Sequence, residues 1–277
     1  WRLPSRPMLE ILLMPFALKA LFVSALISVI CAWSGIFVTI KNMAFFSESI
    51  SHSSLAGIAI ALWLGFDPSL FLVFFSAAAA ALIALVAQSS IASRDSVIGI
   101  VHATIMSAGI ILLGFLRGGN TDIARYLFGD VLAVTSTDLY ICSALFVLAA
   151  AYLAKFSTTH TLTCLTPELA RLNGINVKKY DFMLMILLAL IISVSVKIAG
   201  AILVTALLVI PSNAAKNISA SYNSFVILSI VTGLTGAVAG VAASIFLDFP
   251  TGPSIVLLNS IAYFASLFAR NYLKISI

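Results

Sequence analysis

The chain has 277 residues, of which 62% are hydrophobic and 9% are charged, and its formal net charge at pH 7 is +5. Its mean hydropathy of +1.16 lies far from the balance of a soluble domain, so the composition excludes a water-soluble protein and indicates a membrane protein with several spans. Three widely separated cysteines without a Cys-x-x-Cys pair indicate neither a disulfide framework nor a cysteine zinc site.

Apolar runs follow one another along the chain with only short polar breaks. A helix needs roughly 20 apolar residues to cross the hydrocarbon core of a bilayer. We expect spans near residues 17–40, 50–65, 70–89, 97–116, 138–155, 181–197, 199–217, 224–246 and 254–270. The chain is therefore predicted to be all-α, a single transmembrane bundle of about eight or nine helices over residues 1–277. We find no small-residue cleavage site of a signal peptide and expect the internal helices to direct insertion.

The N-terminal segment, residues 1–16, differs from these spans. Its apolar run is too short to cross the membrane alone, and Pro4, Pro7 and Pro15 interrupt or bound it. We expect this segment to lie along the membrane interface.

The most informative polar residues stand where the first span gives way to the second, in Phe46-Ser-Glu-Ser-Ile-Ser-His52. On a helix, the four-residue spacing of Glu48 and His52 puts both side chains on one face, where they offer a divalent metal ion two ligands. Polar groups inside a hydrocarbon segment carry a desolvation cost that function commonly explains. We therefore predict a metal path at this position.

The fourth span carries a second acid and histidine pair, Asp95 and His102, seven residues or two helical turns apart. Gly99 between them leaves room for close approach of a neighbour or ligand. This pair is a candidate to share one face with the acid and histidine of the second span. In the alternative interpretation, Asp95 caps the helix, Arg94 neutralises its charge and His102 only hydrogen-bonds across helices. The residues alone leave both open.

The break between the fifth and sixth spans is the richest in basic residues: Lys155, Arg171, Lys178 and Lys179. We expect this loop to face the cytoplasm, and alternate counting from it places Lys41 and Arg94 on the same side. The positive net charge then reflects membrane orientation rather than a nucleic-acid patch. His160, in the polar stretch 158–163 of this loop, is expected to be solvated.

A short helix is predicted within this loop, over residues 166–174. Thr166 is a suitable N-cap, Pro167 suits the first helical position, Glu168 the first turn, and Gly174 is a natural stop. Its apolar residues do not continue into a span, so they need a partner surface, either the bundle itself or another protein. Those residues are Leu169, Ala170 and Leu172.

The seventh and eighth spans carry helix-breaking and small residues. Pro211 interrupts the seventh, and Gly233, Gly236 and Gly240 supply small residues along one side of the eighth. We expect close helix packing at these glycines. Pro211 also has a second interpretation, as a bend that moves during transport.

Several motifs together resemble the permease subunits of bacterial zinc and manganese ABC uptake transporters, and the sequence is most similar to the high-affinity zinc type. They are Lys41-Asn-Met-Ala-Phe-Phe with Ser51-His-Ser-Ser-Leu-Ala-Gly57, Asp95-Ser-Val-Ile-Gly-Ile-Val-His102, Tyr126-Leu-Phe-Gly-Asp-Val-Leu-Ala-Val134, the run from Lys197 to Pro211, and Asp248-Phe-Pro-Thr-Gly-Pro253. The resemblance covers nearly the whole chain, and it is the combination of motifs that is specific.

The resemblance implies a homodimer of permeases in the inner membrane, clamped by two ATPase subunits and supplied with metal by a periplasmic or surface binding protein. The family's coupling helix, which contacts the ATPase, falls on Pro167, Glu168, Leu169, Ala170, Arg171 and Gly174. Its metal-coordinating acid and histidine fall on Glu48 and His52, with glutamate where aspartate is usual. His102 stands where zinc-type members carry a histidine, and imidazole suits zinc better than manganese.

The expected function is therefore ATP-driven import of Zn²⁺ as a transported substrate, with Glu48, His52, His102 and Asp95 as candidate metal ligands and no permanently bound cofactor. The chain has no phosphate-binding loop, so ATP hydrolysis is assigned to a separate subunit. A manganese or iron permease of the same family is the main alternative. A proton-coupled transporter would normally show two related halves, a metalloprotease needs a His-Glu-x-x-His motif, and siderophore or cobalamin permeases usually have more spans.

Overall fold

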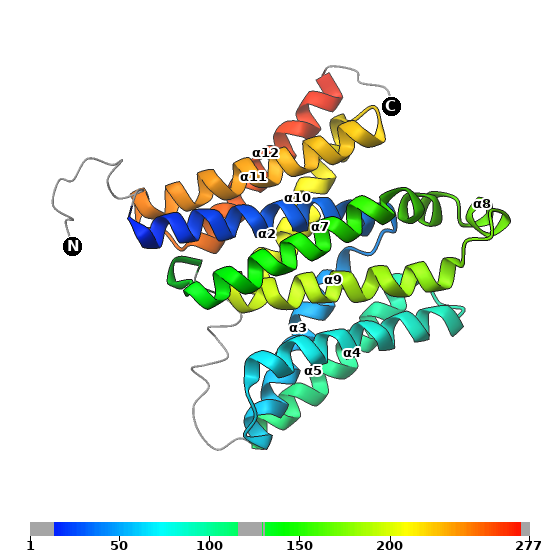
Figure 1. Ribbon diagram of the computed structural model, residues 1–277, viewed down its shortest axis with the longest axis horizontal. Helices are drawn as coiled ribbons and strands as arrows, with labels where there is room; N and C mark the ends of the chain where they lie inside the picture. The colour runs from blue at the N-terminus through cyan, green and yellow to red at the C-terminus, as the bar shows by residue number, and fades with distance from the viewer. Residues whose placement is uncertain (1–13, 116–128, 130, 273–277) are drawn as a thin grey trace.

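The computed structural model describes residues 14–115, 129 and 131–272, and the interfacial segment expected at residues 1–16 lies almost wholly outside them. Every regular element in the described residues is helical (Figure 1). The elements are α2 (Pro15–Ile40), α3 (Ala44–Leu64), α4 (Pro68–Ser89), α5 (Arg94–Phe115), η1 (Val131–Ala133), α7 (Ser136–Leu165), α8 (Pro167–Leu172), α9 (Val177–Ala199), α10 (Ala201–Ile218), α11 (Tyr222–Leu247) and α12 (Thr251–Tyr272).

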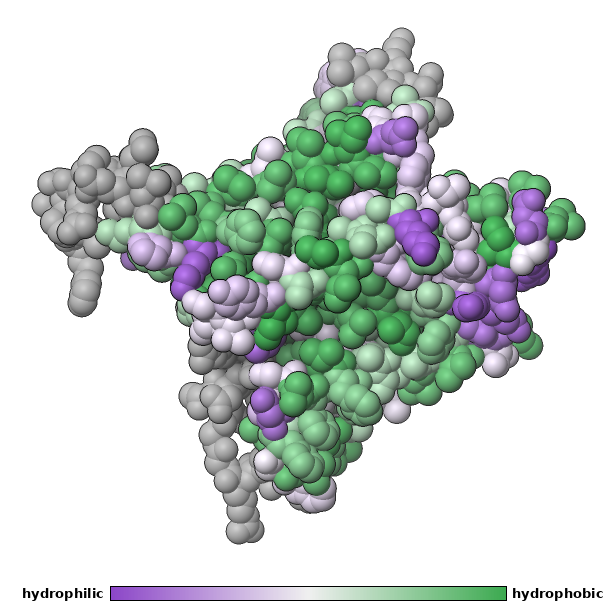
Figure 2. Space-filling model, in the orientation of Figure 1, coloured by the Kyte–Doolittle hydropathy of each residue, from purple (hydrophilic) through white to green (hydrophobic). Residues whose placement is uncertain are grey.

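Each of the nine expected spans corresponds to one of the long helices, so the predicted all-α bundle is confirmed. Eight of these helices are long and apolar enough to cross a membrane; α3, the ninth, is not among them and is the helix that carries Glu48, His52 and five serines. Figure 2 shows an apolar surface along the helices, with hydrophilic residues gathered most densely beside α8. Large apolar side chains such as Leu70, Phe74 and Leu148 are exposed on the helices, as expected for a protein whose surface faces lipid.

Two groups of helices pack side by side. Helices α3, α4 and α5 form one group, and α2, α10, α11 and α12 form the other (Figure 1). Helix α9 joins them because it packs against α4 and α3 on one side and against α7 on the other. Its buried face, which includes Leu184, Leu188 and Ile192, belongs to the same apolar core as Ile27 and Phe37 of α2.

Small residues allow the close helix crossings that the sequence predicted. A Cβ added at Gly240 of α11 would lie 2.6 Å from the Cα of Ile255 in α12, and one at Gly233 would meet Ala32 and Ser28 of α2. These contacts confirm the packing interpretation of the glycines. Pro211 lies inside α10, which continues to Ile218.

The prediction that His160 is solvated was wrong. Helix α7 continues ten residues beyond the expected end of the fifth span, and His160 lies fully buried within it. Its Nε2 lies 3.0 Å from the Tyr152 hydroxyl, and its ring packs edge-on against Phe37 and Tyr180. The helix tolerates this polar stretch because its hydroxyl groups bond to helix carbonyls, as Thr161 Oγ1 does to Ser157 O at 2.8 Å.

Candidate metal site

The packing of α3 against α5 brings three of the four predicted ligands together. The imidazole rings of His52 and His102 have centroids 5.6 Å apart, and Glu48 Oε1 lies 4.0 Å from His52 Nε2 one turn away on the same helix. The Glu48 side chain is 53% exposed and that of His52 27%. One carboxylate and two imidazoles from adjacent helices therefore lie near one another at a partly open surface, and side chains of these types suit a transition metal.

The close approach of α3 and α5 depends on Gly109, a residue that the sequence analysis did not single out. A Cβ at Gly109 would lie 2.8 Å from the Cβ of Ala56, so the two helices are in contact two turns from His102. At Gly99, by contrast, an added Cβ would have no neighbour within 4 Å. Gly109, and not Gly99, therefore permits the close approach of α3 and α5.

Several buried polar atoms of α3 and α5 have no protein partner in the described part of the chain. Within the described residues, no hydrogen bond is made by the Nδ1 atoms of His52 and His102 or by the hydroxyls of Ser49, Ser51 and Ser53. Most buried polar groups in proteins are hydrogen-bonded, because leaving one unpaired in an apolar environment costs free energy. Nitrogen and hydroxyl oxygen atoms left in this state can bind a hydrated cation. The sequence analysis did not single out these serines.

Asp95 does not join this group in the structure. It lies exposed in the first turn of α5, two turns from His102, and forms no hydrogen bond or ion pair with the described residues. In the described part of the chain, no three or more His, Cys, Asp or Glu side chains are placed to hold an ion together. Glu48, His52 and His102 therefore lie near one another but are not placed to bind one ion together in this arrangement.

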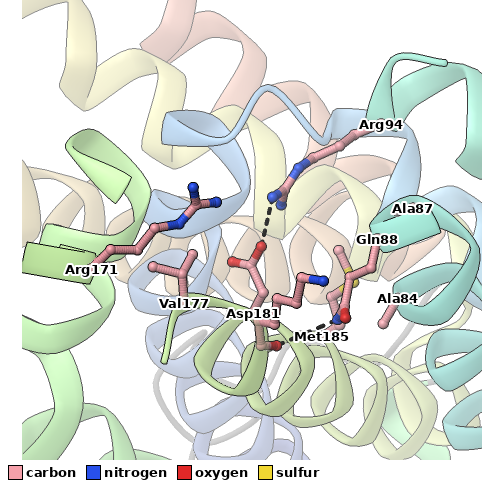
Figure 3. A pocket seen from close by; sticks show the side chains of 9 residues that line it. Ala84, Ala87, Gln88, Arg94, Arg171, Val177, Asp181 and Met185 are labelled. Atoms are coloured by element: carbon pink, nitrogen blue, oxygen red, sulfur yellow. Dashed lines mark hydrogen bonds and ion pairs between the residues drawn. The ribbon is translucent and has the colours of Figure 1, made fainter. Parts of the chain in front are cut away.

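The alternative interpretation had Arg94 neutralise Asp95, but Arg94 pairs instead with a residue of α9. Its guanidinium donates to Asp181 Oδ2 at 2.6 Å (Figure 3), and Lys41 Nζ pairs with the other carboxylate oxygen. Asp181 is 6% exposed. These ion pairs border a pocket of about 190 Å³ that Arg171 of α8 also lines. The sequence analysis did not predict them.

Helix α8 occupies the loop position predicted for it. It runs from Pro167 to Leu172, with Thr166 at the N-cap position and Gly174 in the left-handed region at φ 74°. The Thr166 hydroxyl bonds back to Leu162 O of α7 at 3.4 Å, so it does not cap α8 as expected. Of the apolar residues, Ala170 is fully buried against the bundle, whereas Leu169 and Leu172 are 51% and 84% exposed. The bundle is therefore the partner surface of Ala170, whereas Leu169 and Leu172 have none of comparable extent within the described residues.

Comparison with known proteins shows that the chain is similar to transport proteins. The sequence pattern of the family described as "ABC 3 transport family" matches residues 13–270. The chain is 34% identical to the high-affinity zinc uptake system membrane protein ZnuB of Haemophilus influenzae over 92% of its own length and 97% of the relative's. It is 31% identical to the manganese transport system membrane protein MntC of Listeria monocytogenes, over 92% and 91%. The solved structure of PsaBC from Streptococcus pneumoniae in complex with Fab superposes with a TM-score of 0.83 at 29% identity, covering 96% of this chain and 98% of that one.

Proposed function

The chain belongs to the ABC 3 transport family and is a permease of a metal ABC importer, and from that premise we propose that the ion it carries into a bacterial cell is Zn²⁺. The relatives named for zinc and for manganese are similarly close, so the choice of ion rests on the site. The observation that carries it is the pairing of His52 with His102 across α3 and α5. Imidazole nitrogen is a preferred zinc ligand, at about 2.0–2.1 Å, whereas manganese prefers oxygen.

Mn²⁺ is the second candidate, and a specific observation favours it. The Glu48 carboxylate, which lies 4.0 Å from His52 Nε2, is an oxygen ligand of the type that manganese prefers. Either ion would meet an incomplete ligand set that water completes. Such a site suits transport because an ion must bind well enough to enter and weakly enough to leave.

The proposed mechanism is alternating access across the inner membrane, driven by two ATPase subunits that act on a dimer of this chain. A binding protein would deliver the ion at the end of the bundle opposite α8. The exposed Leu169 and Leu172 on α8 support a docking role for this helix, because apolar side chains in an aqueous loop need a partner surface. In this arrangement residues 166–174 face the cytoplasm and the whole chain acts as one membrane domain.

Uptake of radioactive zinc tests the site in cells that carry Glu48→Gln, His52→Ala or His102→Ala at matched membrane expression. We expect each variant to lose most uptake because each removes one of few ligands. His160→Leu serves as the control, since His160 is the only other histidine of the chain and is buried elsewhere in α7. Unchanged uptake in all three site variants would refute the site. Uptake that unlabelled Mn²⁺ blocks at lower concentration than Zn²⁺ would favour the second candidate.

A further inference from the structure

One buried carboxylate joins α9 to α5 and to the α2–α3 junction, at the end of the bundle that carries α8. Asp181 of α9 pairs through its two oxygens with Lys41 and Arg94. The Lys41 side chain is 6% exposed, and that of Asp181 is 8% exposed. The charges of Lys41 and Asp181 are therefore shielded from water. In such an environment an ion pair is directional and sensitive to small displacements.

The two cations stand at the start of the two helices that carry the candidate metal ligands. Lys41 lies three residues before α3, which holds Glu48 and His52, and Arg94 is the first residue of α5, which holds His102. Between Lys41 and α3, Asn42 has a φ of 52°, a left-handed backbone conformation that a residue other than glycine adopts at a cost. The junction is thus held in a specific shape close to its ion pair.

Asp181 is also fixed to α8 through a short, hydrogen-bonded corner. The amide of Ile175 donates to Ala170 O of α8 at 2.9 Å, and the Asn176 side chain caps α9 by accepting from Lys179 N at 3.1 Å. Asp181 follows in the next turn of α9. A displacement of α8 would therefore move the start of α9, and Asp181 with it.

The pockets between these helices leave space for such a movement. One of about 320 Å³ is lined by Lys41, Arg94, Arg171 and residues of the α7–α8 corner, and the pocket in Figure 3 lies between Arg94, Asp181 and Arg171. Arg171 points from α8 towards the carboxylate of Asp181, which Arg94 approaches from the other side. The α8 end is therefore not tightly filled around its ion pairs.

We propose that Asp181 is a positioning residue for transport, which passes the movement of α8 to α3 and α5 and so changes the spacing of the metal ligands. The assignment rests on the proposed function. Replacing a buried ion pair by apolar groups is often neutral for stability, so a buried cluster of three charges is weak support for a purely stabilising role. A link between the loop helix and both ligand helices gives the cluster a functional reason.

The test uses the complete transporter, with its ATPase subunits and binding protein, reconstituted in vesicles with Zn²⁺ and Mn²⁺ as separate probe ions. The quantity measured is the number of ions transported per ATP hydrolysed. For Asp181→Asn we expect this ratio to fall at least about five-fold, the lower range of typical coupling between sites, and Asp181→Glu should restore part of it. Asp138→Asn is the matched control, because Asp138 pairs with Lys197 at 3.2 Å near the opposite end of α7 and α9.

A second variant, Lys41→Met with Asp181→Asn, removes both buried charges together and so avoids leaving Lys41 unpaired. A lowered ratio in this variant, with normal assembly, supports transmission through Asp181. A ratio equal to that of the unchanged transporter overturns it, and so does failure of both variants to assemble, which would make the cluster a folding requirement. If the unchanged transporter moves neither ion, the proposed function fails instead, so the two failures are distinguishable.

Discussion

Replacing Gly109 by alanine should weaken metal binding by pushing α3 and α5 apart. The added Cβ would lie 2.8 Å from the Cβ of Ala56, whereas ordinary van der Waals contact begins at 3.4 Å. The helices must therefore separate locally by about 0.6 Å, the difference between these distances. Metal sites tolerate ligand displacements of only about 0.2 Å, so His52 and His102 should no longer reach one ion together.

The expected size of the effect is a loss of zinc affinity on the order of ten-fold, which corresponds to about 1.4 kcal/mol. Zn²⁺ titration of the purified protein in detergent measures it directly. Alanine in a helix interior is about 1 kcal/mol more favourable than glycine, and overpacking costs about 1–3 kcal/mol. The free energy of unfolding should therefore change little or fall slightly, while the affinity falls clearly.

Gly99→Ala is the matched control, because it makes the same change on the same helix where no heavy atom lies within 4 Å of the added Cβ. Its zinc affinity should equal that of the unchanged protein. Equal affinities for the Gly109 and Gly99 variants would refute the argument that the α3–α5 contact sets the spacing of the ligands.

Three further predictions concern helix packing and coupling. Leu169→Asp on the exposed side of α8 should abolish uptake yet leave insertion normal, and retained metal-stimulated ATP hydrolysis would contradict a docking role. His160→Leu should cost about 1 kcal/mol of stability by removing the bond to Tyr152 without changing zinc affinity; a weakened affinity would place His160 in the site. Gly35→Ala should lower the melting temperature sharply or prevent assembly, since its Cβ would lie 2.0 Å from Leu208 O of the backbone, and an unchanged melting temperature would show that the crossing is loose.

The sequence predicted the helices well because hydrophobic runs report membrane spans directly. The ends were harder to predict. Helix α3 begins at Ala44 rather than near residue 50, because serine and glutamate lowered the local hydropathy without preventing a helix. The predicted fifth span ended before the end of α7 for a similar reason. Threonine side chains that bond to helix carbonyls look like loop residues in the sequence.

For the site, too, contacts between residues close in sequence were easier to predict than contacts between distant ones. Glu48 and His52 are one turn apart, so helical periodicity alone predicted that they meet. His102 joins them only through the crossing of α3 and α5, which depends on Gly109 and Ala56. The pairs of Asp181 with Lys41 and Arg94 span 140 and 87 residues, and no local pattern selects those partners over nearer ones such as Asp95.

The unsatisfied hydroxyls and ring nitrogens beside the ligand histidines bear on how fast an ion can pass. If all the polar groups along an ion path were hydrogen-bonded to one another, those bonds would have to break before the groups could bind an ion. That step would slow entry of the ion. If the ion passes these atoms as proposed, binding it would break no hydrogen bond that they make within the described residues. Under the proposed function, this would lower the barrier to entry of the ion, and the motion of the helices rather than dehydration of the ion would then limit turnover.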